Sequence, residues 1–195
     1  MGLAWKDYDE KKQAEVMSFC DDYMAFLSEA KTERRFVQLA IEKAEAAGYR
    51  NIEEIIQKKE PLHPQEKVYM NQMNKAVALM QIGDDPLEDG MNILGAHIDS
   101  PRLDLKQHPL YEEGDLAYFD THYYGGVKKY QWVTIPLAIY GVVVLKNGQT
   151  IDVAIGDKEE DPVFVISDLL IHLASKQMNK KADQVVELSL IHISE

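Results

Sequence analysis

The apolar residues in the first part of the chain repeat with helical spacing. A predicted helix over residues 11–30 has one apolar face, made of residues three or four positions apart: Val16, Cys20, Tyr23, Met24 and Leu27. Thr32 can cap a second helix, which is predicted to run to Ala47 and to stop at Gly48. Asn51 is expected to cap a short third helix. The chain therefore starts with helices.

The pattern changes after Glu66. Residues 67–72 and 75–82 are predicted to form the two strands of a hairpin. The apolar run Met91–Ala96 is typical of a strand that is buried on both faces. Helices followed by buried strands favour an α/β layer architecture.

A second change comes near residue 105, beyond which β-branched and aromatic residues dominate from Leu116 to Ile155. The pair Asn147-Gly148 predicts a two-residue turn between strands 142–146 and 149–155. A further strand is predicted over 163–166. Ser167 is then expected to cap a helix whose apolar side holds Leu169, Leu170, Leu173 and Ala174. We place a domain boundary near residue 105.

Composition and charge narrow the class of protein. The hydrophobic fraction is 46%, which favours a folded chain with a core. The net charge of −12 argues against nucleic-acid binding, which needs a basic surface. No apolar run reaches the ~20 residues of a membrane helix, and the first residues lack a secretory pattern. We expect a cytoplasmic protein in which the single cysteine, Cys20, is a buried and unreactive thiol.

The candidate chemistry lies in the segment Asn92–Pro101, where His97 ends an apolar run and Asp99 follows two residues later. Ligands bind outside the carboxyl ends of strands in open α/β sheets. There the imidazole can bind a metal while Asp99 accepts the other ring N–H, which fixes the tautomer. One histidine and one carboxylate do not complete a zinc site, which needs three or four protein ligands. By spacing alone, His97 is more often a polar strand-end residue than a ligand.

Three segments resemble the aspartyl aminopeptidase and aminopeptidase I family of zinc metallopeptidases. Gly95-Ala-His97-Ile-Asp99-Ser-Pro101 is similar to the family segment Gly-Ala-His-x-Asp-Ser-Pro. Tyr124-Gly-Gly126 and the stretch Pro162–Leu173 resemble two later family segments. They occur in the family order.

This resemblance implies a zinc aminopeptidase that removes single N-terminal residues from peptides. His97 would be a zinc ligand, Asp99 the aspartate that orients it, and two zinc ions are expected in the complete enzyme. The family subunits assemble into dodecamers. Residues 1–105 would be the first part of the α/β catalytic domain, and 106–185 an incomplete β-rich inserted dimerisation domain.

The chain also departs from the family pattern. Ser167-Asp168 stands where the family has Pro-His, and His172, which matches the second histidine there, is expected to be structural. The family's other ligands and its general base have no match here. The Glu112-Glu113 and Glu159-Glu160 pairs are interpreted as solvated surface pairs.

The last residues, 186–195, do not resemble the family. The stretch Leu188–Glu195 is similar to a translated sequencing adapter, so we expect a non-native tail and do not count His192 as a ligand. The chain would then be a truncated, inactive part of the enzyme. Two alternatives stay open: a non-catalytic assembly or interaction fragment, and a different metal-dependent hydrolase that uses the same His-x-Asp pair.

Overall fold

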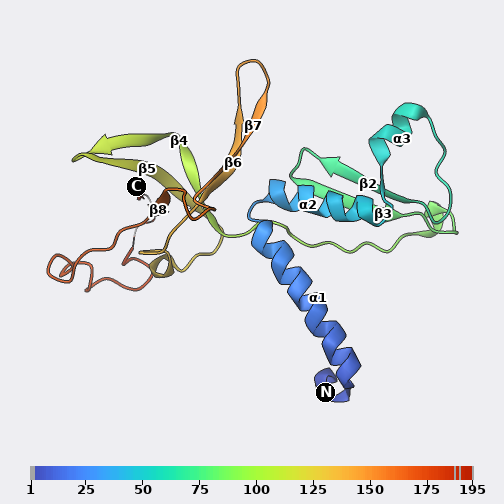
Figure 1. Ribbon diagram of the computed structural model, residues 1–195, viewed down its shortest axis with the longest axis horizontal. Helices are drawn as coiled ribbons and strands as arrows, with labels where there is room; N and C mark the ends of the chain where they lie inside the picture. Colours follow the sequence, from blue (N-terminus) through green and yellow to red (C-terminus); the bar gives the residue numbers. More distant parts are fainter. Residues whose placement is uncertain (1–2, 187, 189, 195) are drawn as a thin grey trace. The chain divides into compact units, whose positions relative to one another are not determined.

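The computed structural model describes residues 3–186, 188 and 190–194. The chain divides into two compact units, one ending at Asp99 and the other beginning at Ser100 (Figure 1). Both units contain β-sheet, and the long helices belong to the first, so the chain is a mixed α/β protein.

The three α-helices of the first unit begin at side-chain caps. They are α1 (Glu10–Glu29), α2 (Glu33–Ala46) and α3 (Ile52–Lys58). The described part of the unit also has two 3-10 turns without such a cap, η1 (Ala4–Asp7) and η2 (Leu87–Asp89). Asp9 accepts the backbone N–H of Lys12 at 2.7 Å, which caps α1. Thr32 accepts the N–H of Arg35 at 3.2 Å at the start of α2, and Asn51 caps α3. Each side-chain oxygen satisfies a backbone donor that a helix leaves unpaired. The three predicted helices are confirmed.

A small sheet accompanies these helices. Its strands are β1 (Arg50–Asn51), β2 (Lys67–Gln72) and β3 (Ala76–Gln81), in the order β1-β2-β3. β1 runs parallel to β2, and β2 pairs with β3 antiparallel. Met73 and Asn74 connect β2 to β3 with φ angles of 56° and 55°. Positive φ at both central residues is the condition for the tight turn that suits the twist of a hairpin. The predicted hairpin is confirmed.

The core of the first unit lies between α2, α3 and this sheet. Val37 of α2 and Val68 of β2 have no exposed surface, and Ile55 of α3 is 2% exposed. Figure 1 shows α2 running along β2 and β3. Burial of this kind stabilises a fold by about 1.5–3 kcal/mol for each side chain.

α1 takes no part in this core. None of its residues, all of which the structure describes, is buried. Cys20 is exposed, so the prediction of a buried thiol was wrong. Helical periodicity predicts which side chains share a face, but it carries no information on whether another element covers that face.

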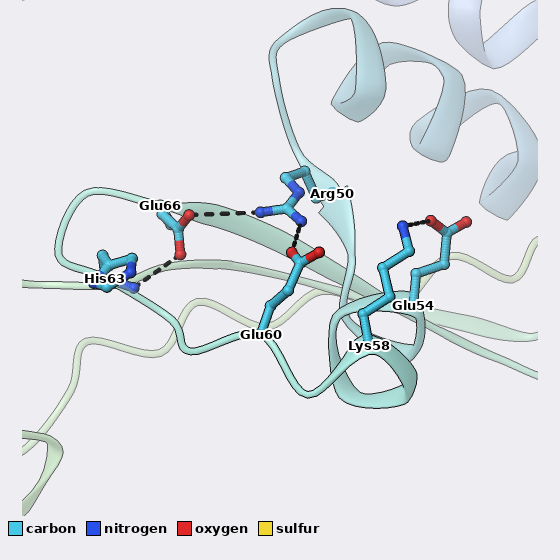
Figure 2. Close-up of polar contacts among 6 residues, drawn as sticks. All are labelled: Arg50, Glu54, Lys58, Glu60, His63 and Glu66. Atoms are coloured by element: carbon cyan, nitrogen blue, oxygen red, sulfur yellow. Dashed lines mark hydrogen bonds and ion pairs between the residues drawn. The ribbon is translucent and has the colours of Figure 1, made fainter.

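A cluster of ion pairs fastens the segment that follows α3 to the sheet (Figure 2). Arg50 of β1 pairs with Glu60 and, at 3.5 Å, with Glu66. The carboxylate of Glu66 also accepts the backbone N–H of His63 at 2.8 Å. The proline-containing segment 60–66 is thus held at both of its ends by one guanidinium group.

The second unit contains two sheets. Its strands are β4 (Arg102–Glu113), β5 (Leu116–Tyr124), β6 (Ile139–Val144), β7 (Thr150–Ile155), β8 (Val163–Val165) and β9 (Leu190–Ser194). The larger sheet has the order β4-β5-β9-β8, with antiparallel pairing throughout. The strand predicted over 163–166 is therefore confirmed as β8. Residues 190–194 of the predicted tail form β9, which pairs with β5 and β8.

The core of the second unit is small and lies beside β8. Its four buried residues are Phe164, Ile166, Val186 and Leu188. Thr121 of β5 is 2% exposed, and its hydroxyl donates to the carbonyl of Leu188 at 2.9 Å. This bond ties the last described turn of the chain to the sheet.

The hairpin of β6 and β7 is confirmed, but its turn is longer than predicted. The N–H of Gly148 donates to the carbonyl of Leu145 at 2.9 Å, and the N–H of Leu145 donates to the carbonyl of Gln149 at 2.8 Å. Gly148 has a φ of 85°. This is a three-residue loop with glycine in the left-handed region, and not the two-residue turn that Asn-Gly pairs favour.

The helix predicted after Ser167 is absent, which is a second error. Residues 167–186 form turns and contain no helix or strand. Leu170 and Leu173, on the predicted apolar side, are 72% and 70% exposed. Short helices take most of their stability from a packed apolar face, and this face has little to pack against. His172 is also exposed in these turns.

Candidate metal centre

The segment that carries His97 is extended but forms no strand. Residues 91–101 belong to no helix and to none of the described ladders, so the predicted buried strand Met91–Ala96 was wrong. Ile93 is 80% exposed and Leu94 is fully exposed. A strand needs a neighbour for its backbone hydrogen bonds, and the described part of the chain does not supply one here.

His97 and Asp99 nevertheless lie together. The Nδ1 atom of His97 is 3.2 Å from Oδ1 of Asp99 and 3.1 Å from its backbone oxygen. Both oxygens are acceptors, so Nδ1 carries the proton in these contacts. The lone pair of a neutral ring is then on Nε2, which is the atom that a metal would bind.

The exposure of the two side chains differs. The His97 ring is 85% exposed and the Asp99 carboxylate is 37% exposed. The ring is therefore accessible to an ion, and the carboxylate is the more enclosed partner.

The described residues do not bring together enough donors for a complete zinc site. Among them, no three His, Cys, Asp or Glu side chains are placed to hold a metal ion together. The Glu112-Glu113 and Glu159-Glu160 pairs are exposed, in agreement with their interpretation as surface pairs. Zinc takes three or four protein ligands, so the donors that are present fit a single imidazole of such a site.

Just after this segment, the first residues of the second unit contact the end of β5. Arg102, the first residue of β4, pairs with Tyr124, the last residue of β5, and its guanidinium lies 4.1 Å from the centre of the Tyr124 ring. Gly125 has a φ of 81°, and a Cβ there would lie 3.5 Å from Cα of Pro101. Tyr124 thus contacts Arg102, and Gly125 lies close to Pro101, so these two residues of the Tyr-Gly-Gly sequence lie against the first residues of the second unit.

A model of one peptidase family matches most of the chain. The family is described as aminopeptidase I zinc metalloprotease (M18), and the match covers residues 26–195. The chain belongs to the M18 family. The description of this family names an aminopeptidase and a zinc metalloprotease. Zinc and peptide hydrolysis are therefore properties of the family to which these residues belong.

Named relatives agree with this assignment. A probable M18 family aminopeptidase 1 from Clostridium acetobutylicum is 55% identical over 94% of this chain. A protein of the same name from Thermotoga maritima is 45% identical over 85% of the chain. The match covers 40% of the Clostridium protein and 36% of the Thermotoga protein, so the chain spans about 40% of the length of its relatives.

Solved structures match the fold over nearly the whole chain. The crystal structure of aminopeptidase I from Clostridium acetobutylicum superposes with a TM-score of 0.86 at 49% identity, over 99% of this chain and 42% of that one. An M18 aminopeptidase from Thermotoga maritima gives a TM-score of 0.87 at 38% identity, over 98% of this chain and 41% of that one.

Among the described residues, no helix is long and apolar enough to cross a membrane.

Proposed function

We propose that the chain carries a zinc ligand of a zinc-dependent aminopeptidase that removes single N-terminal residues from peptides. His97 is the ligand, through Nε2, and Asp99 is the group that orients it. The observation that carries this proposal is the contact of His97 Nδ1 with two oxygens of Asp99, at 3.1 and 3.2 Å. Membership of a zinc metalloprotease family supplies the metal and the reaction class.

The chain's own residues would act on the ligand and not on the peptide. A pair of zinc ions, when bound, lowers the pKa of a water molecule and polarises the peptide carbonyl. Asp99 keeps the proton of His97 on Nδ1, which leaves Nε2 free and raises its basicity. The high exposure of the ring leaves it accessible to the metal and to the groups that complete the site.

We also propose that these 195 residues do not cleave peptides unaided. The support is the donor set: the described part of the chain holds one histidine with its carboxylate, and no cluster of three donors. A catalytic zinc needs about three protein ligands and an open position for water. The remaining ligands and the general base would come from residues outside this chain.

A chimeric enzyme tests the proposal. This chain aligns over 184 residues with the Clostridium acetobutylicum relative, so it can replace the matching part of that protein. We expect the chimera to cleave N-terminal residues from peptides in a zinc-dependent manner. In the chimera, His97→Ala removes a ligand and should abolish activity and lower the zinc content. Asp99→Asn should weaken zinc affinity by about 10- to 100-fold.

His63→Ala is the matched control, because His63 is also exposed in the first unit but lies in the loop that Glu66 holds. The control should keep the zinc content and activity of the parent chimera. Full activity and full zinc content in the His97→Ala chimera would exclude His97 as a ligand. Equal losses in both variants would point to a folding defect.

A second candidate function, an assembly or interaction fragment, has its own support. Phe19 and Met24 of α1 are 71% and 56% exposed, and β6 and β7 form a sheet of two strands with exposed apolar residues. Size-exclusion chromatography of the isolated chain tests this candidate: self-association supports an assembly fragment, and a monomer contradicts it. Dodecamer formation and a cytoplasmic location stay predictions.

A further inference from the structure

The turn between β6 and β7 contains a reactive pair of residues. Asn147 is followed by Gly148, and both are exposed. The other asparagines of the chain precede larger residues: Ile52, Gln72, Lys75, Ile93 and Lys180. Glycine leaves the amide nitrogen after an asparagine open to the side chain, since it has no Cβ. We propose that Asn147 is a deamidation site whose rate is set by opening of the β6–β7 hairpin.

The reaction needs no partner other than water. The backbone nitrogen of Gly148 attacks the side-chain carbonyl carbon of Asn147, and the new N–C bond closes a succinimide ring. The bond from that carbon to the side-chain nitrogen breaks, and ammonia leaves with the proton from the Gly148 nitrogen. Water then opens the ring at either carbonyl and leaves aspartate or isoaspartate.

The closed turn opposes this attack. The Gly148 N–H, which must give up its proton, donates to the carbonyl of Leu145 at 2.9 Å. The side-chain oxygen of Asn147 accepts the N–H of Gln149 at 3.0 Å. Both reacting groups are therefore held by other partners while the hairpin is closed, and they become free to meet when it opens.

The hairpin that holds the turn is weakly supported. β6 and β7 pair only with each other among the described strands. Val144 and Ile151, which flank the turn, are 65% and 43% exposed. A two-stranded hairpin without a packed face is marginally stable in water, so it opens locally more easily than the rest of a fold.

Conversion to isoaspartate would prevent the turn from closing again. Isoaspartate places the side-chain carbon in the backbone, which lengthens the loop between Leu145 and Gln149 and disturbs their hydrogen bonds. Either product also adds a negative charge to an already acidic chain. The amount of product at Asn147 would therefore increase with the time that the hairpin has spent open.

Peptide mass mapping during incubation at mildly alkaline pH tests the proposal. We expect Asn147 to convert fastest of all the asparagines, and to convert several-fold faster in urea than in buffer. Mass separates this reaction from isomerisation at Asp89-Gly90, which leaves the mass unchanged. The N147Q variant should show no conversion at the turn in either solvent.

Val153→Gly tests the gating step. Val153 pairs with Gly141 in the middle of the hairpin, away from the turn. Glycine weakens a strand and should raise the rate at Asn147 in buffer by about two- to fivefold. The rate in urea, where no hairpin remains, should not change, which controls for effects on the chemistry.

Two results would overturn the inference. Equal rates at Asn147 in buffer and in urea would show that the hairpin does not gate the reaction. Conversion at Asn147 no faster than at Asn71 or Asn92 in urea would show that this pair is not a preferred site.

Discussion

Two apolar segments of the first unit end in opposite environments. β2, over Lys67–Gln72, contains Val68, which has no exposed surface, and Tyr69, which is 6% exposed. Met91–Ala96 is more apolar and richer in aliphatic residues, yet Leu94 is fully exposed. β2 has α2 on one face and β1 and β3 at its edges, whereas the second segment has no described neighbour. The presence of partners, more than composition, separates a strand from an exposed segment.

The largest expected difference comes from placing a charge in each segment. Val68→Asp buries an unpaired carboxylate, and should cost more than about 4 kcal/mol and unfold the first unit. Leu94→Asp changes a side chain that is already in water, and should change the free energy of unfolding by less than about 0.5 kcal/mol. Urea unfolding followed by circular dichroism measures both. A similar loss in both variants would mean that Met91–Ala96 is packed in solution.

A smaller effect is expected at the hydrogen bond that joins β2 to α2. The hydroxyl of Tyr69 donates to Glu45 of α2 at 2.7 Å. Tyr69→Phe should lower the free energy of unfolding by about 1–2 kcal/mol, because the acceptor is charged. Urea titrations of the two proteins at neutral pH give this value.

The same hydrogen bond predicts a pH dependence. The bond to Glu45, with burial, raises the pKa of Tyr69 from 10.0 to about 12. The folded state therefore keeps its phenolic proton while the unfolded state loses it, so this contribution is complete below pH 10 and is lost as the pH rises towards 12. As the pH rises from 10 towards 12, the free energy of unfolding should fall more steeply in the parent protein than in the Tyr69→Phe variant. Parallel curves would contradict the assignment.

A further small effect is expected at Arg50, whose ion pairs hold the segment before β2 (Figure 2). Its side chain is 46% exposed, and exposed ion pairs contribute little. Arg50→Met keeps the aliphatic stem and should lower the free energy of unfolding by less than Tyr69→Phe does, and this loss should shrink at high salt. A cost above that of Tyr69→Phe would show that the cluster matters more than surface ion pairs usually do.

Local sequence signals predicted much of the fold. Thr32 and Asn51 cap the helices that were expected of them, and the 67–82 hairpin formed as its pattern predicted. These features depend on neighbours in sequence. Three predictions failed because they depend on distant partners: the burial of Cys20, the strand Met91–Ala96 and the helix after Ser167.

The candidate site was predictable for a similar reason. His97 and Asp99 are two residues apart, so their contact forms locally and does not need the strand that was expected to hold them. The other donors of a zinc site would have to come from distant residues, and no spacing rule within this chain could locate them.

The most direct test of the account is a crystal structure of the chimeric enzyme with anomalous diffraction data at the zinc edge. The account predicts zinc about 2.0–2.1 Å from Nε2 of His97, with Nδ1 against Asp99. A fully occupied zinc site that His97 does not touch, or zinc bound through Nδ1, would contradict it.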